Sequence, residues 1–226
     1  MVAFDISAWI ETIQAHGLRQ INKRKGGIHM EPIILASGSL RRQEFFRLLD
    51  LPFSIMAALI DENYGDATDL RGKAEEMALK KVNKILDLLK NGTPPWICGA
   101  DTIISVDGVI FGKPKDRDDA KRMLTTLQDR EHDVVTAVAL YNRRNRSIDS
   151  RTVVSTVRFA PLSEGEIEWY LNTGEWQGMA GAYKIQGLAG CYVSEINGSY
   201  SSIVGLPIRE FYVMLRENGY PYGGNQ

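Results

Sequence analysis

Cysteine is scarce in this sequence, and that scarcity limits the kinds of site the protein can hold. The 226 residues contain two cysteines, Cys98 and Cys191, which lie far apart and form no Cys-x-x-Cys pair. Neither a zinc site nor a disulfide framework is therefore predicted. A reducing compartment fits this composition, and we expect the protein to be cytoplasmic.

The sequence also lacks long hydrophobic runs and a strong net charge. No stretch approaches the length of a membrane-spanning helix, so we expect no membrane association. The net charge is -1, so the protein has no overall positive potential that would attract nucleic acid. We expect no stable nucleic-acid binding. A local basic pocket for a small polyanion stays compatible with this charge.

The composition is that of an ordinary folded domain, with 44% hydrophobic and 24% charged residues. We predict one main unit over residues 30–226, preceded by an N-terminal extension, residues 1–29. In the extension an approximately helical apolar stripe ends in the basic run Lys23 to Lys25, which favours an extra helix packed on the domain. A mitochondrial presequence is the alternative, although Asp5 and Glu11 fit such an acid-depleted signal poorly.

The stretch Gly99-Ala100-Asp101-Thr102 is the most informative in the chain. It follows Trp96 to Cys98, a short apolar run typical of a buried strand. Small residues leave room beside Asp101. We therefore expect Asp101 where this strand ends, at an edge and not in the core.

A tight hairpin is predicted directly after Asp101. Thr102 to Val106 and Val109 to Phe111 are β-branched and apolar, and Asp107-Gly108 between them supplies the positive φ angles of a two-residue turn. The hairpin returns Lys113 toward Asp101. A carboxylate and an amine brought together beside glycines suit a polyanion and its metal ion, while a surface salt bridge is the alternative interpretation.

A second candidate site follows the predicted strand Pro32 to Ala36. Here Ser37 and Ser39 lie in a small-residue loop that leads into a helix, and helix N-termini favour phosphate through free amide groups and partial positive charge. Arg41 and Arg42 in the first turn would add forked donors to phosphate oxygens. In the alternative interpretation Ser39 caps the helix and both arginines are solvated.

Further candidate side chains follow the next strand, which is predicted over Phe53 to Ile60. Asp61 and Glu62 come directly after it, where two adjacent carboxylates either hold a divalent ion or form a polar turn. Asp69 then caps a long helix predicted from Arg71 to Lys90. Three lysines mostly belong to the wet face of this helix, although one could turn inward: Lys80, Lys81 and Lys84.

The rest of the chain supplies more strands and helices and one small-residue loop. His132 starts a predicted strand, where it would serve as an acid or base or would merely be hydrogen-bonded. The loop from Gly178 to Gly187 either brings backbone close to a flat ligand or makes a tight turn. Its polar or aromatic side chains are Tyr183, Lys184 and Gln186. The other predicted elements are strands over His132 to Tyr141, Arg151 to Phe159 and Cys191 to Ile196, and helices that start near Asp116, Ser163 and Ile208.

Several of these motifs recur in the same order in one known family. They are Ile34 to Arg42, Ile60-Asp61-Glu62, Gly99 to Thr102, Gly112-Lys113-Pro114, Ala180 to Tyr183 with Ile185-Gln186-Gly187, and Gly198-Ser199-Tyr200 to Gly205-Leu206-Pro207. From Pro32 to the final helix, the chain resembles the Maf family of nucleoside triphosphate pyrophosphatases.

The resemblance implies a fold and a reaction. The fold is α/β, an elongated, twisted mixed β-sheet with flanking helices and two lobes around a cleft, similar to inosine triphosphatases and assembled as a homodimer. Family members use magnesium or manganese to hydrolyse the bond between the α and β phosphates, which releases a nucleoside monophosphate and pyrophosphate and cleans the nucleotide pool. The family's historical association with septum formation leaves a second function open, a nucleotide-binding regulator of cell division with little turnover.

The resemblance also implies roles for individual residues. Asp101 matches the family's proton acceptor, which would orient or deprotonate the attacking water. Asp61 or Glu62 would join Asp101 around the metal ion. The residues that would hold the triphosphate are Ser37, Ser39, Arg42 and Lys113, together with Lys81, which matches a lysine of the family's long helix.

One branch of the family acts on dTTP and UTP. The residues that match the positions distinguishing this branch are Arg41, Thr102 and Gln186. The amide of Gln186 offers both an acceptor and a donor, which suits the imide edge of uracil or thymine. The chain departs from the family pattern at four positions. Leu40 replaces a proline, Val82 an alanine, Met179 a lysine and Lys184 a glycine, and the last two bear on the base preference.

Overall fold

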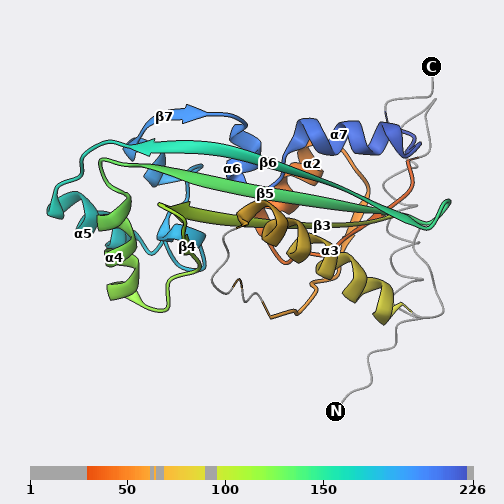
Figure 1. Cartoon of the computed structure of the whole chain (residues 1–226), viewed down its shortest axis with the longest axis horizontal. Coiled ribbons are helices and arrows are strands. Elements are labelled where there is room, and N and C mark those ends of the chain that lie inside the picture. The colour runs from red at the N-terminus through yellow and green to blue at the C-terminus, as the bar shows by residue number, and fades with distance from the viewer. Residues whose placement is uncertain (1–29, 62–63, 65–68, 90–95, 223–226) are drawn as a thin grey trace, which may run out of the picture.

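The structure is a computed structural model that describes residues 30–61, 64, 69–89 and 96–222; the predicted extension and Glu62 lie outside them. Seven strands of the described chain form one sheet in the order β2-β1-β3-β5-β6-β7, with β4 paired to β3 (Figure 1). The strands are β1 Ile33–Leu35, β2 Phe53–Ile55, β3 Trp96–Val106, β4 Val109–Phe111, β5 Glu131–Asn142, β6 Ser147–Phe159 and β7 Val193–Asn197.

The sheet is mixed, as predicted. β1 pairs in parallel with β2 and β3, whereas the other strand pairs are antiparallel. The long strands β3, β5 and β6 run along the long axis of the molecule (Figure 1). The helices are α2 Leu40–Leu48, α3 Leu70–Leu88, α4 Arg117–Leu127, α5 Glu164–Thr173, α6 Tyr200–Val204 and α7 Ile208–Glu217, with short 3-10 turns η1 Ala180–Ala182 and η2 Leu188–Tyr192.

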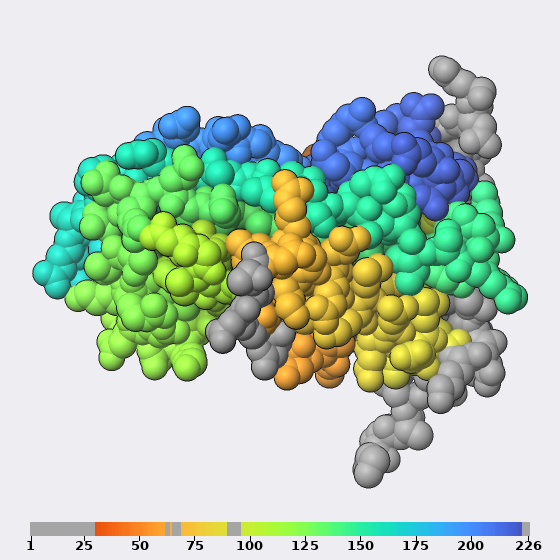
Figure 2. Space-filling model, in the orientation of Figure 1, coloured from red at the N-terminus to blue at the C-terminus, as the bar shows by residue number. Residues whose placement is uncertain are grey.

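Side chains alternate between the two faces of β3, as the pleat of a strand requires. Cys98 and Ala100 pack with α2 and α7 on one face, and Ile97 and Ile103 pack with α3 on the other. A third cluster joins β4, α4 and α5 at the far end of the long strands. The core clusters therefore lie at two ends of the long strands, which agrees with the expected two lobes. The elements of these two ends are at the left and right of Figures 1 and 2.

Local sequence signals determine where the helices start. The Asp69 side chain accepts from the Gly72 amide at 3.0 Å and caps α3, and Asp116 caps α4 in the same way. Ser163 and Glu166 form the predicted capping box of α5. None of the helices in the described part of the chain is long and apolar enough to cross a membrane.

The prediction that Asp101 lies at the end of a strand is wrong. β3 continues from Trp96 to Val106, and Asp101 lies inside it with 3% of its surface exposed. Gly99 provides the physical reason, because a Cβ there would lie 2.6 Å from the carbonyl oxygen of Ala78 in α3. Only glycine lets α3 pack this closely, and α3 then covers the part of the strand that the sequence places at an edge.

Two other strands are shorter than predicted. β2 ends at Ile55, because its partner β1 ends at Leu35 and the Met56 amide donates the last bond, 3.1 Å to the Leu35 carbonyl. Asp61 therefore follows an irregular segment and not a strand. The last strand begins at Val193, because Cys191 lies in the turn η2.

Candidate active site

A pocket of about 1090 Å³ opens beside β3, where the sheet has a gap. β5 pairs along one edge of β3, so β1 and β4 share the other edge. On that edge β1 pairs with Trp96 to Cys98 of β3, and β4 pairs with Ile104 to Val106 of β3. The strand between these two partners faces the pocket. The lining segments come from far apart in the sequence: residues 36–42, 101–104, 110–113, 178–180 and 183–185.

Both carboxylate oxygens of Asp101 are held by donors. Lys81 Nζ lies 2.7 Å from Oδ1, and the Tyr64 hydroxyl donates to Oδ2 at 2.9 Å. Lys81 is 5% exposed, so it is the lysine of α3 that turns inward, and the close contact at Gly99 brings it to Asp101. The pocket therefore contains a buried ion pair whose charges compensate each other within the protein.

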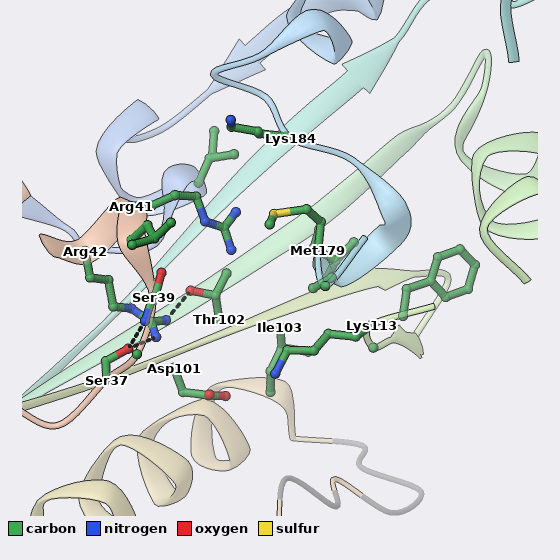
Figure 3. A pocket seen from close by; sticks show the side chains of 18 of the residues that line it. Ser37, Ser39, Arg41, Arg42, Asp101, Thr102, Ile103, Lys113, Met179 and Lys184 are labelled. Atoms are coloured by element: carbon green, nitrogen blue, oxygen red, sulfur yellow. Dashed lines mark hydrogen bonds between the residues drawn. The ribbon is translucent and has the colours of Figure 1, made fainter. Parts of the chain in front are cut away.

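Arg42 is buried and spans three separate parts of the chain. Its guanidinium donates to the Gly205 carbonyl at 2.8 Å, to Ser37 Oγ at 3.2 Å and to Thr102 Oγ1 at 3.1 Å; Figure 3 shows the last two bonds. Thr102 Oγ1 also accepts from Thr136 at 3.0 Å. The interpretation in which both arginines are solvated is wrong for Arg42, which braces the loop after β1 against β3.

Arg41 differs from its neighbour. It is half-buried, lines the pocket and forms no hydrogen bond or ion pair with the described residues. Burial lowers the pKa of its guanidinium, and the nearby charge of Arg42 lowers it further. Ser37 and Ser39 line the same wall, but the Ser39 side chain makes no capping bond to α2, so the predicted cap is absent from this helix.

The predicted hairpin brings Lys113 to the pocket. Val106 pairs with Val109, and Asp107 and Gly108 between them have φ angles of 50° and 79°, as a two-residue turn of this kind requires. Lys113 follows β4 and its side chain reaches toward the side of the pocket that holds Asp101 (Figure 3). Asp61 also lines the pocket.

Gln186 and His132 lie deeper. The side-chain amide nitrogen and oxygen of Gln186 are both buried and have no partner among the described residues. Gln186, a predicted substrate-binding residue, does not itself line the pocket, although the preceding residue, Ile185, does. His132 Nε2 lies 2.8 Å from the Tyr183 hydroxyl, and burial lowers the pKa of its imidazole to about 4. His132 does not line the pocket, so of its two interpretations the hydrogen-bonded one is confirmed.

Sequence reasoning missed Tyr64 as a partner of Asp101. Tyr64 lies in an irregular segment before α3, and its polar neighbours give no periodic pattern that would indicate an inward side chain. The predicted site residues that do line the pocket are Ser37, Ser39, Arg41, Arg42, Asp61, Lys81, Asp101, Thr102 and Lys113.

Comparison with known proteins then places the chain. The sequence profile described as Maf-like protein matches residues 32–218, the part of the chain that the sequence resemblance covers. The chain belongs to the Maf-like protein family. Within this family, the dTTP/UTP pyrophosphatase of Symbiobacterium thermophilum is 41% identical, over 85% of this chain and 96% of its own.

Other similarities add detail. The dTTP/UTP pyrophosphatase of Hahella chejuensis is 43% identical to this Maf-like chain, over 83% of it and 92% of its own length. Among solved structures, the Staphylococcus aureus Ham1 protein has a TM-score of 0.41 at 14% identity, covering 57% of this chain and 72% of its own. That structural likeness is slight.

Proposed function

We propose that this Maf-like protein is a hydrolase acting on acid anhydrides, a pyrophosphatase that cleaves the α–β phosphate bond of dTTP and UTP. The observation that carries the proposal is the buried pair of Asp101 and Lys81 in a pocket that opens at the N-terminus of α2. The names of relatives 41% and 43% identical support this substrate class.

Asp101 is proposed to orient the attacking water and to take up its proton. Lys81 and Tyr64 hold one oxygen each, which fixes the plane of the carboxylate and leaves each oxygen a further lone pair. The water oxygen bonds to phosphorus beside the α–β bridge and its proton passes to Asp101. The bond between that phosphorus and the bridging oxygen breaks, and nucleoside monophosphate and pyrophosphate separate.

The phosphate chain is assigned to the wall formed by Ser37 and Ser39 and to Lys113. The first turn of α2 presents free amide groups at this wall, and these favour phosphate oxygens. Arg42 supports the same wall from behind, because its three bonds to Ser37, Thr102 and the Gly205 carbonyl fix the wall in place. We therefore assign Arg42 a positioning role in substrate binding.

The carboxylates of the pocket fit a divalent cation. Mg²⁺ commonly binds through one or two carboxylates together with substrate phosphates, and Asp61 and Asp101 both line the pocket. Within the described residues there is no group of three or more His, Cys, Asp or Glu side chains that would form a cage made of protein alone. We propose that Asp101 and Asp61 hold Mg²⁺ or Mn²⁺, with Glu62 as a further ligand. The cation would offset negative charge on the phosphates.

The base is assigned to Arg41, Thr102 and Gln186. Arg41 and Thr102 line the pocket, and Gln186 has a buried donor and a buried acceptor with no partner among the described residues. An imide edge of uracil or thymine would satisfy one donor and one acceptor. We further propose that the enzyme is a homodimer, for which light scattering should give twice the mass of the chain.

The test is pyrophosphate release from standard and modified ribo- and deoxynucleoside triphosphates, with Mg²⁺ and with Mn²⁺. We expect the fastest release from dTTP and UTP, and a fall in kcat of about 100- to 10,000-fold in Asp101→Asn, as for the loss of a general base. Lys80→Gln is the surface control, because Lys80 is exposed, pairs with Glu76 and does not line the pocket. Tight triphosphate binding by a wild-type protein that releases no pyrophosphate would instead favour the regulator of cell division.

A further inference from the structure

Among the described residues, five cations line the pocket, and four of them form two contrasting pairs: Lys81 with Arg42, and Arg41 with Lys184. Lys81 pairs with Asp101, and Arg42 donates to three protein acceptors. The side chains of Arg41 and Lys184, in contrast, form no hydrogen bond or ion pair with the described residues, although both are half-buried in the pocket wall. A half-buried positive charge without a protein partner is available to a ligand that brings acceptors or negative charge.

The backbone that carries Lys184 is firmly held. Its amide donates to the Tyr170 hydroxyl at 3.1 Å. The preceding residue, Tyr183, has its hydroxyl 2.8 Å from His132 Nε2, and its ring centre lies 4.9 Å from that of Phe159. Lys184 therefore projects from a fixed point, and a contact between its ammonium group and a bound ligand would discriminate between ligand shapes.

The surroundings of Lys184 indicate which part of a nucleotide lies beside it. In Figure 3, Lys184 and Met179 lie on the opposite side of the pocket from Asp101 and Ser37. The Asp101 side holds the carboxylates and Ser37, in the loop that leads into α2, and these groups suit phosphate and its cation. Met179 lies on the Lys184 side (Figure 3), and Tyr183 and Ile185, which flank Lys184 in the sequence, also line the pocket. Apolar and aromatic side chains of this kind suit a flat base.

We propose that Lys184 is a specificity-determining residue that favours pyrimidine triphosphates with an acceptor-rich or anionic group on the base, such as a carboxylate on C5. The proposal rests on the proposed function, which places the phosphates at Asp101 and leaves the base for the Lys184 side. Lys184 is one of the positions at which the chain departs from the family pattern that it resembles, which has a glycine there. An ammonium group supplies three donors and a full charge, and a C5 methyl group offers it nothing in return.

The experiment compares dTTP with 5-carboxy-dUTP, in which a carboxylate replaces the C5 methyl group. Initial rates of pyrophosphate release are measured for wild type, Lys184→Gln, Lys184→Arg and the control Lys115→Gln, which removes an exposed lysine outside the pocket. We expect Lys184→Gln to lower kcat/KM for 5-carboxy-dUTP about tenfold, mainly through KM, as expected for one charge-assisted contact. Turnover of dTTP should change much less, and Lys184→Arg should retain the preference.

The outcomes separate the two proposals. If Lys184→Gln changes both substrates by the same factor, or neither, while wild type hydrolyses dTTP, the inference is overturned and the proposed function stands. An equal loss that disappears with the corresponding diphosphates would place Lys184 at the terminal phosphate instead. If wild type releases no pyrophosphate, the proposed function fails, and calorimetric binding of the two nucleotides to wild type and Lys184→Gln still decides the specificity question.

Discussion

The two ends of the pocket differ in whether their charged side chains have partners within the protein. At the Asp101 end, the carboxylate, Lys81 and Tyr64 satisfy one another before any ligand binds. At the Lys184 end, Arg41 and Lys184 have no hydrogen-bond or ion-pair partner in the described part of the chain. An end completed by the protein is preorganised for chemistry, whereas an end completed by the ligand discriminates between ligands.

The largest expected effect comes from breaking the Asp101 end with Lys81→Met. This substitution leaves a buried carboxylate without its counter-charge, so the free energy of unfolding should fall by about 3–5 kcal/mol, and turnover should collapse. Thermal and urea denaturation, together with pyrophosphate release, measure both effects.

Two further variants give this prediction its controls. Lys80→Met removes the neighbouring exposed lysine and should change stability by less than about 0.5 kcal/mol. The double variant Lys81→Met with Asp101→Asn should be more stable than Lys81→Met alone, because no buried charge is then left unpaired. Equal destabilisation by Lys81→Met and Lys80→Met would mean that the ion pair contributes nothing to folding.

The sequence predicts what depends on short-range chemistry. Asp69 and Asp116 cap their helices, and Asp107-Gly108 turns its hairpin, because each signal acts within a few residues. The family motifs also bring Asp101, Lys113 and the loop after β1 to one pocket. Local pattern and motif order therefore account for most of the fold and for many of the residues that line the pocket.

What the sequence does not predict depends on distant contacts. Asp101 is buried because α3 packs on Gly99. The residues around Asp101 do not indicate that this helix will cover them. Arg42 is buried because it reaches the Gly205 carbonyl, 163 residues further along the chain. Whether Lys81, Arg42, Arg41 or Lys184 has a partner within the protein depends on packing, so the sequence does not distinguish these four side chains in this respect.

A smaller effect concerns the support beneath the Lys184 end, where His132 bonds to Tyr183. The pKa of His132 is about 4 because burial disfavours the imidazolium, whereas an unfolded histidine titrates near 6.5. The unfolded state therefore binds more protons between these values, and stability is lost as the pH falls below about 6.5. From about pH 7 to about pH 5 the loss from this group should be about 2 kcal/mol.

His132→Gln isolates that contribution, because glutamine can keep a hydrogen bond to Tyr183 without titrating. The free energy of unfolding, measured by denaturation at each pH from about 7 to about 5, should fall by about 2 kcal/mol less in the variant than in wild type. If the free energy of unfolding depends on pH in the same way for both proteins, the imidazole is not held neutral in the folded state. His132 does not contact the Asp101 end. Lys81→Met should therefore lower the free energy of unfolding by the same amount in the His132→Gln background as in wild type.

The smallest effect on stability, and the sharpest contrast with Lys81, is expected from Arg41→Gln. Arg41 is half-buried next to the charge of Arg42 and lacks a hydrogen-bond or ion-pair partner among the described residues, so removing its charge relieves an unfavourable environment. The free energy of unfolding should change by no more than about 0.5 kcal/mol, while kcat/KM for dTTP should fall about 10- to 100-fold through loss of a charged hydrogen bond to substrate. Denaturation and steady-state kinetics on one preparation measure both. A stability loss comparable to that of Lys81→Met would show that Arg41 serves the fold, and the contrast between a completed end and a ligand-completed end would not hold.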